Sequence, residues 1–292
     1  MILITGAAGK TGRAVIRALT KGAETIRGLV RRAEQAPSLE ALGVEEVRVV
    51  DLLDRDKMAA AVQGIRAIYH LAPNVSPDEM EMGKVIIAAA TSNAVEHFVF
   101  HSVLHPQIEA MPHHWQKARV EELLFASGLP FTILQPTAYM QNILAQWDHI
   151  IGKGKFPVPY PAATRLCLVD LEDVAQAAAT VLSEPGHIGA IIELVGTPPM
   201  SQSEIAEVLA GQLGISVTAD HLPVEVWERG VRASGLGDYQ VRTLIEMFHY
   251  YENHGLVGNS NALRCLLQRQ PTSFPEFVRR IAGKGENDHR TG

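Results

Sequence analysis

The stretch MILITGAAGKTG, residues 1–12, decides the fold of this chain. An apolar run from Met1 to Ile4 leads straight into glycines at positions 6, 9 and 12, and a helix with one apolar face is expected over Arg13 to Lys21. In this order the first glycine allows a tight turn, the second lets the backbone approach a phosphate, and the third lets the helix pack closely on the strand. The stretch therefore predicts a dinucleotide-binding turn; a plain tight turn between strand and helix is the alternative.

The helix that follows this turn supplies what a pyrophosphate needs, because its first amide groups and its dipole both favour negative charge. Gly9-Lys10-Thr11 also looks like the end of a P-loop, but a P-loop requires a glycine where this chain has Ile4, inside the strand. Lys10 is therefore interpreted as a cation near the cofactor phosphates. The predicted cofactor contacts in the turn are Gly6, Ala8, Gly9, Lys10, Thr11 and Gly12.

Strands and helices alternate through the first half of the chain with short connections. Strands are expected at 1–4, 24–30, 45–50, 65–71, 97–102 and 131–135, and helices at 13–21, 33–42, 54–62, 79–94 and 115–127. Continuous apolar strands are typical of a parallel sheet covered on both faces. The pattern predicts an α/β fold, a doubly wound parallel-sheet Rossmann domain with a smaller helix-rich C-terminal region, whose ligands lie at the carboxyl ends of the strands.

The pattern changes after Pro136, and this change sets the expected domains. The dinucleotide-binding domain covers residues 1–152, and residues 165–195 return to it. Residues 153–164 and 196–282 form a substrate-binding region, with a proline-rich loop at 152–161 and a capping box, Ser201 to Glu204, before a run of helices. Those further helices are expected at 223–233, 238–253, 259–267 and 273–281. Residues 283–292 are expected to form a disordered tail.

The composition is that of an ordinary soluble protein, with 292 residues, 47% hydrophobic and 20% charged. A net charge of -6 argues against a nucleic-acid surface, and two cysteines give neither a disulfide framework nor a metal spacing. The chain starts on a core strand, which leaves no room for a signal peptide, and no apolar run is long enough to span a membrane. We therefore expect a cytoplasmic monomer or homodimer that takes a small-molecule substrate, with no nucleic-acid or membrane partner and no metal.

The end of the second strand distinguishes NADP from NAD. An NAD site usually has an acidic residue there, whereas this chain has Arg31 and Arg32, whose planar, permanent charges suit a 2′-phosphate. NADP(H) is therefore the predicted cofactor; two solvated arginines at a helix start are the alternative. Topology places Asp51 near the adenine and residues Leu71, Ala72 and Pro73 along the cofactor, and ordinary loop roles remain the alternative for both.

Candidate reacting groups follow the fifth and sixth strands. Ser102 ends the fifth strand, and the run HHWQK at 113–117 opens the next helix. Histidine titrates near neutral pH, so His113 or His114 can serve as an acid, with a structural histidine as the alternative. Residues 136–142 follow the sixth strand and face the switch point. Tyr139 is the candidate there for cofactor contact, and Met140 and Asn142, together with His114, are candidates for substrate contact. Loop and helix packing is the alternative. Phe156, Tyr160 and Trp227 can add aromatic surface, although each is more often core.

Several of these segments resemble the NmrA-like group of atypical short-chain dehydrogenases. The matching pieces are TGAAGKTG, LVRR, FVFHSV, HHWQKARVEELLFASGLPFTILQPTAYMQN, VDLEDVAQAAATVL and GTPPMSQSEIAEVLAGQLG, and they cover roughly residues 1 to 215. The resemblance implies that Lys117 touches the nicotinamide ribose. Short-chain dehydrogenases carry a serine and then Y-x-x-x-K at the places of Ser102 and residues 113–117, so His113 replaces the proton-donating tyrosine and classical carbonyl reduction is in doubt.

The group that the chain resembles includes NADPH-dependent quinone and dye reductases, relatives of isoflavone reductase, and inactive redox-sensing regulators. The expected function is an NADPH-dependent oxidoreductase that transfers hydride to a quinone-like or conjugated small molecule, because such acceptors do not need a tyrosine acid and the cofactor carries the chemistry. Lys117 or a water that it holds can give the proton, as can His113 or His114, and Ser102 is a further catalytic candidate. The alternative is a non-catalytic NADP(H)-sensing regulatory protein; a sugar-nucleotide epimerase relative ranks last because that chemistry depends on the tyrosine.

Overall fold

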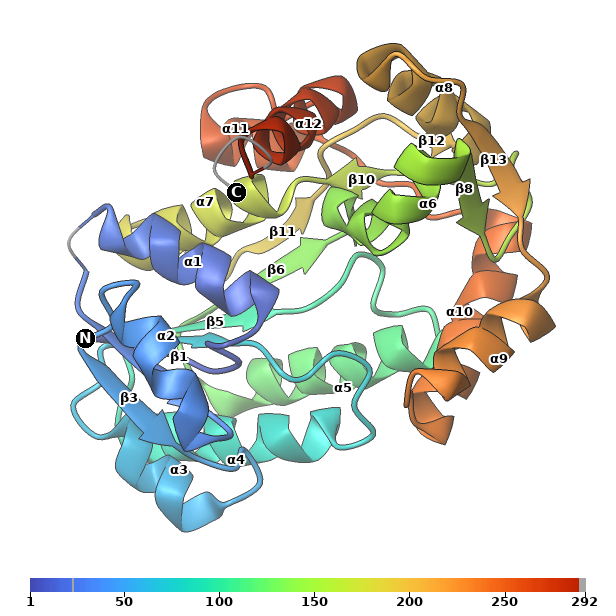
Figure 1. The fold of residues 1–292 in the computed structure, drawn as a ribbon. Helices are drawn as coiled ribbons and strands as arrows, with labels where there is room; N and C mark the ends of the chain where they lie inside the picture. The colour runs from blue at the N-terminus through green and yellow to red at the C-terminus, as the bar shows by residue number, and fades with distance from the viewer. Residues whose placement is uncertain (23, 289–292) are drawn as a thin grey trace. The chain divides into compact units, whose positions relative to one another are not determined.

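A computed structural model describes residues 1–22 and 24–288, and its main element is a seven-stranded sheet (Figure 1). The strand order is β11-β6-β5-β4-β1-β2-β3, and every neighbouring pair is parallel. Because β1 lies between β2 and β4, the direction of winding reverses beside β1, which confirms the doubly wound Rossmann prediction. The strands are β1 (Ile2–Ile4), β2 (Ile26–Val30), β3 (Glu46–Val49), β4 (Ala67–His70), β5 (His97–His101), β6 (Phe131–Pro136) and β11 (Ile191–Leu194).

The helices that follow these strands cover the two faces of the sheet. They are α1 (Lys10–Thr20), η1 (Ala33–Gln35), α2 (Ala36–Glu40), α3 (Arg55–Val62), α4 (Glu79–Ser92), α5 (Pro112–Ser127) and α7 (Leu171–Ser183). One core cluster joins Leu3, Ile68 and Phe98 of the sheet to apolar residues of α3, α4 and α5, such as Ile86. Side chains alternate between the faces of a strand, so Ile2 and Ile4 point to the opposite face, where α1 lies (Figure 1).

The chain divides into two compact units. The first contains residues 1–136 and 174–194, and the second contains residues 137–173 and 195–292. The first unit therefore ends its long segment at Pro136 and not at the expected 152, because residues 140–153 pack into the core of the second unit. The assignment of the two regions to cofactor binding and substrate binding stays a prediction.

The second unit combines short strand pairs with helices. The strand pairs are β7 (Ala138–Tyr139) with β10 (Leu168–Val169), β9 (Arg165–Leu166) with β12 (Met200–Ser201), and β8 (Lys155–Val158) with β13 (Thr218–His221). Its helices are η2 (Met140–Gln146), α6 (Trp147–Lys153), α8 (Gln202–Leu213), α9 (Val224–Ala233), α10 (Asp238–His254), α11 (Asn261–Leu267) and α12 (Phe274–Asp288). An apolar cluster that includes Ile150, Leu209 and Phe277 forms its core.

Two expectations for this unit need correction. The loop expected at 152–161 contains β8, which pairs with β13 some sixty residues later in the chain, so no local pattern reveals it. The tail expected over 283–292 is helical in its first part, because α12 continues to Asp288, and residues 289–292 lie outside the described part of the chain.

Local capping signals in the sequence are confirmed. Ser201 and Glu204 form the expected capping box at the start of α8, with the Glu204 amide donating to Ser201 Oγ at 3.2 Å and the Ser201 amide donating to Glu204 Oε2 at 2.6 Å. Gly128 ends α5 in the left-handed conformation, φ +71°. These ends follow from a few neighbouring residues, which explains why sequence reasoning locates them.

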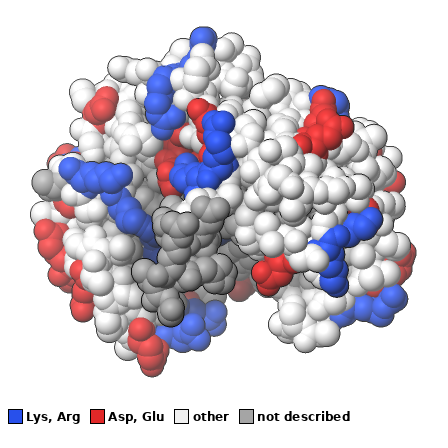
Figure 2. All heavy atoms as spheres, turned by 45° about the horizontal axis from the view of Figure 1, so that its top comes forward, with Lys and Arg blue, Asp and Glu red and all other residues white. Residues whose placement is uncertain are grey.

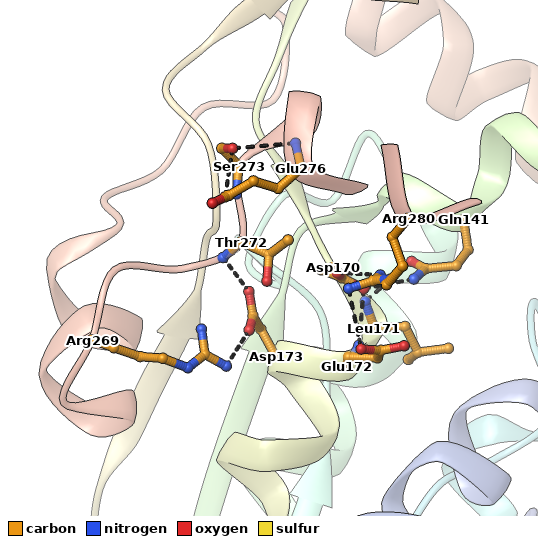
Figure 3. Close-up of polar contacts among 10 residues, drawn as sticks. All are labelled: Gln141, Asp170, Leu171, Glu172, Asp173, Arg269, Thr272, Ser273, Glu276 and Arg280. Atoms are coloured by element: carbon orange, nitrogen blue, oxygen red, sulfur yellow. Dashed lines mark hydrogen bonds and ion pairs between the residues drawn. The ribbon is translucent and has the colours of Figure 1, made fainter. Parts of the chain in front are cut away.

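Within the second unit, two buried carboxylates beside the start of α7 bind α12, the segment between α11 and α12, and Gln141 (Figure 3). Asp173 accepts hydrogen bonds from Arg269 Nη2 and from the Thr272 amide, both at 2.6 Å. Asp170 accepts from Arg280 Nη2 at 2.5 Å and from Gln141 Nε2 at 2.7 Å. Both aspartates are fully buried, so each depends on these donors for compensation of its charge.

One face of the molecule is mixed in charge (Figure 2). On the face that Figure 2 shows, lysine and arginine side chains are interspersed with aspartate and glutamate, and the drawn charged groups do not gather into a patch of one sign. Among the helices in the described ranges 1–22 and 24–288, none is long and apolar enough to cross a membrane.

Candidate cofactor and reacting site

The glycine-rich turn is held by close backbone packing. Gly6 has φ +59°, and a Cβ there would lie 2.8 Å from the carbonyl oxygen of Leu71. A Cβ on Gly12 would lie 2.4 Å from the Gly6 carbonyl oxygen and 2.8 Å from Ala7 Cα. Both positions therefore require glycine for the fold itself, the first for its conformation and the second for contact between helix and turn.

Gly9 differs from its two neighbours in the motif. It is exposed, its φ of -74° suits any residue, and the nearest atom to a Cβ there would be the Gly6 carbonyl oxygen at 3.3 Å. Gly9 is also the N-cap of α1, whose first turn has neither a side-chain cap nor an acidic residue. Gly9 thus leaves exposed backbone at a helix N-terminus whose N-cap makes no side-chain hydrogen bond, an arrangement that fits a pyrophosphate.

Arg31 and Arg32 follow β2 on the same edge of the sheet and are exposed. Gln35 Oε1 accepts hydrogen bonds from both of their backbone amides, at 3.2 and 3.1 Å. Neither guanidinium takes part in an ion pair within the part of the chain that the structure describes, so both charges are available to an anionic ligand. Arg13, which sequence reasoning missed, links the turn to this segment by donating to the Ala8 carbonyl at 3.1 Å and to Ser38 Oγ at 2.5 Å.

The other predicted cofactor contacts lie at the carboxyl ends of neighbouring strands. Thr5 Oγ donates to the Leu71 carbonyl at 2.9 Å and accepts from the Leu71 amide at 2.8 Å, which joins the ends of β1 and β4. Ala72 is buried and Pro73 exposed. Asp51 is exposed after β3, and its Oδ1 accepts from the Leu53 amide at 3.0 Å. Contact of these residues with a cofactor stays a prediction.

Lys117 lies buried on α5, facing the ends of β4 and β5. Its Nζ donates to Glu79 Oε1 at 2.8 Å and to the His101 carbonyl at 3.1 Å, and it lies 5.3 Å from the centre of the Phe100 ring. An ammonium has three donors, and these two bonds use two of them. One donor is therefore left for a ligand, which fits the single ribose contact that the family resemblance implies.

Ser102, which follows β5, belongs to a second buried hydrogen-bond network. Its partner in this network, Glu121, lies one turn after Lys117 on α5. The Ser102 hydroxyl donates to Glu121, and Gln135 Nε2 donates to both Glu121 oxygens at 2.9 and 3.2 Å. Burial raises the pKa of Glu121 above its ordinary value, against the opposing effect of these hydrogen bonds. Glu121 was not predicted, although its place four residues after Lys117 puts both on one face of the helix.

The two histidines at the start of α5 lie in surroundings that lower their pKa values. His113 and His114 lie in the first turn of α5, which begins at Pro112, three residues earlier than expected. Burial lowers the pKa of His114 to about 4 and that of His113 well below its usual range, helped in both cases by the Lys117 charge. These lowered pKa values argue against either histidine as an acid near neutral pH, and a catalytic role for them stays a prediction.

The candidates in the second unit separate into core and surface. Met140 is fully buried in the apolar core, which favours the packing alternative over substrate contact. Tyr139 is half-buried in β7 and Asn142 is exposed in η2. The rings of Trp227 and Phe248 lie 4.7 Å apart, Tyr160 lies 6.0 Å from Phe248, and Phe156 is buried in the core.

In residues 1–22 and 24–288, no three histidine, cysteine, aspartate or glutamate side chains are grouped as metal ligands.

Comparison with known proteins adds independent information. The chain is 27% identical over 284 residues to NAD(P)H azoreductase of Xenophilus azovorans, covering 96% of this chain and 97% of that protein. It is 28% identical over 280 residues to quinone oxidoreductase 2 of Escherichia coli strain K12, covering 95% of this chain and 97% of that protein. The crystal structure of the Escherichia coli NADPH-dependent quinone oxidoreductase complexed with NADPH superimposes on this chain with a TM-score of 0.85 at 28% identity. The match covers 96% of this chain and 99% of that one.

These relatives match along almost the whole chain, so the likeness includes both compact units. The sequence profile of the NmrA-like family matches residues 1–278, which includes the glycine-rich turn, the arginine pair and Lys117. The chain belongs to the NmrA-like family.

Proposed function

We propose that this chain is an NADPH-dependent oxidoreductase that transfers hydride to a quinone-like or other conjugated small molecule. The observation that carries the proposal is the turn at residues 6–12, where the fold requires Gly6 and Gly12 but leaves Gly9 and the N-terminus of α1 open to a phosphate. Relatives of similar length that are 27% and 28% identical are an azoreductase and a quinone oxidoreductase, and both names describe reduction of conjugated molecules.

The arginine pair supports NADPH over NADH. Two exposed guanidinium groups without an ion pair among the described residues follow β2, where NAD-binding folds usually place a carboxylate. A 2′-phosphate gains charge-assisted hydrogen bonds there, whereas a plain ribose hydroxyl does not. A related quinone oxidoreductase structure holds NADPH.

The reaction proposed here needs a hydride and a proton. Bound NADPH would supply the hydride. The lowered pKa values of half-buried His113 and buried His114 argue against an imidazolium acid near neutral pH, so the proposed source is Lys117 or a water that it holds. The Ser102 hydroxyl donates a hydrogen bond to Glu121, so it is already engaged. A quinone or an extended cation accepts hydride without a tyrosine acid, which is consistent with the histidine at position 113.

Calorimetric titration with NADPH, NADP⁺ and NADH tests the cofactor, and a turnover assay at 340 nm with quinones and azo dyes tests the chemistry. We expect NADPH to bind more tightly than NADH and at least one acceptor to be reduced, with loss of turnover in Lys117→Ala. Tight NADPH binding without turnover of any acceptor would instead favour a non-catalytic NADP(H) sensor. Absence of binding by all three nucleotides would refute both functions.

We further infer a cytoplasmic location, since the two cysteines are free and a reducing compartment keeps them so. Cell fractionation tests the location. The expectation of a monomer or homodimer is tested by light scattering of the purified protein.

A further inference from the structure

Lys117 is fixed by more contacts than a flexible lysine usually has. Its two hydrogen bonds go to different elements, Glu79 on α4 and the His101 carbonyl on β5, and the Phe100 ring lies under the ammonium. Two bonds at fixed directions determine where the third donor of a tetrahedral ammonium points. If the Glu79 bond were lost, the four-carbon stem could pivot about the remaining bond.

Glu79 is a costly residue for a purely structural position. It is 1% exposed, and its Oε2 has no hydrogen-bond partner within the described part of the chain. A buried carboxylate oxygen without a partner costs free energy, and a buried ion pair is often no more stabilising than an apolar pair of similar volume. Stability alone therefore does not explain a glutamate at the first residue of α4.

Glu79 is the carboxylate that bonds to Lys117, whereas Glu121, one turn further along α5, interacts with Lys117 by charge alone and is held by Ser102 and Gln135. Burial lowers the pKa of His70 and of His101 to about 3, so both are neutral beside the ammonium at neutral pH. His113 and His114 on α5 are neutral for the same reason. Among the described residues, Glu79 is the carboxylate that forms an ion pair with Lys117.

We propose that Glu79 is a positioning residue, which balances the buried charge of Lys117 and aims its third donor at the nicotinamide ribose. The inference rests on the proposed function, because it assumes that NADPH binds. Glu79 itself touches neither cofactor nor substrate, and it acts through Lys117 alone. Its removal should therefore weaken contacts to the nicotinamide half of NADPH and leave the adenosine half unchanged.

The test compares two ligands by calorimetry. NADPH contains the nicotinamide ribose, whereas adenosine 2′,5′-bisphosphate carries the 2′-phosphate but lacks it. In Glu79→Gln, we expect the affinity for NADPH to fall about tenfold, the loss of one hydrogen bond from a charged donor, with the affinity for the bisphosphate within about twofold of wild type. The matched control is Glu81→Gln on the same helix, which breaks only a surface ion pair with Lys84 and should change neither affinity.

Each outcome decides a different point. If wild-type protein binds neither ligand, the proposed function fails; if it binds both and Glu79→Gln keeps the wild-type ratio of affinities, only the inference on Glu79 fails. Equal weakening of both ligands would indicate a general structural role and would also overturn it. If Glu79→Gln does not fold, the single variant Lys117→Met is compared with the double variant Glu79→Met/Lys117→Met. The double variant removes both partners of the buried ion pair, so neither charge is left unpaired. The two should then bind NADPH equally, and a further loss in the double variant would show that Glu79 does not act through Lys117.

Discussion

Replacing Gly9 with alanine separates what the glycine-rich turn does for the fold from what it does for the ligand. The added Cβ would meet only the Gly6 carbonyl oxygen, at 3.3 Å, and the backbone φ of -74° is one that alanine adopts freely. Gly9 is the N-cap of α1, where alanine is a poorer cap than glycine by roughly 0.5–1 kcal/mol. We therefore expect Gly9→Ala to lower the free energy of unfolding by no more than about 1 kcal/mol.

The effect on the cofactor should be larger. A methyl group at this exposed position occupies the space through which a phosphate reaches the amide groups of α1. Loss of one hydrogen bond to a charged phosphate costs about 1.5–3 kcal/mol, which corresponds to a weakening of NADPH binding by about 10- to 150-fold. The expected signature is a protein of nearly normal stability that binds NADPH poorly.

Urea unfolding and calorimetry together measure this signature. Gly12→Ala is the first comparison, because its Cβ would lie 2.4 Å from backbone, and we expect it to lose about 2 kcal/mol of stability as well as NADPH binding. Gly211→Ala is the second, because this glycine lies inside α8 with no neighbouring atom within 4 Å, and it should gain about 0.5–1 kcal/mol and bind NADPH normally. If Gly9→Ala binds NADPH as wild type does, the assignment of this turn to the pyrophosphate is refuted.

Three further predictions concern charge. Arg31→Glu should weaken NADPH much more than NADH, because only NADPH carries a 2′-phosphate, and equal losses in calorimetry would count against the assignment. Arg269→Ala should lower the free energy of unfolding by about 1–3 kcal/mol in urea, because among the described residues it leaves the buried Asp173 only the Thr272 amide as a donor. Because Arg269 is half-exposed, we expect the lower part of that range (Figure 3). Burial lowers the pKa of His101 to about 3, below its unfolded value of about 6.5, so the unfolded chain binds more protons at acid pH. The contribution of His101 to the free energy of unfolding should be fully present above pH 6.5 and should be lost as the pH drops toward 3. The loss is at most about 1.4 kcal/mol per pH unit for this histidine. A Tm that did not fall between pH 7.5 and 5 would contradict the burial of His101.

Sequence reasoning was most successful where a few neighbouring residues determine the structure. The order of strand, glycine turn and helix at residues 1–20 follows from apolar periodicity and from glycine positions that tolerate close backbone contact. The capping box at Ser201 and the helix end at Gly128 are local in the same sense. Pairings between distant segments carry no such signal, which is why β8 and β13 were missed.

The candidate site shows the same division. The sequence by itself determined the fold class, the glycine turn, the arginine pair after the second strand and the place of Lys117 on a helix, since each depends on spacing along one or two elements. Only the tertiary structure placed Glu79 against Lys117, because the two lie on different helices that meet beside the sheet. It also gave the direction in which the pKa values of His113 and His114 shift, because burial, which lowers them, is a property of the packed molecule and not of the residue type.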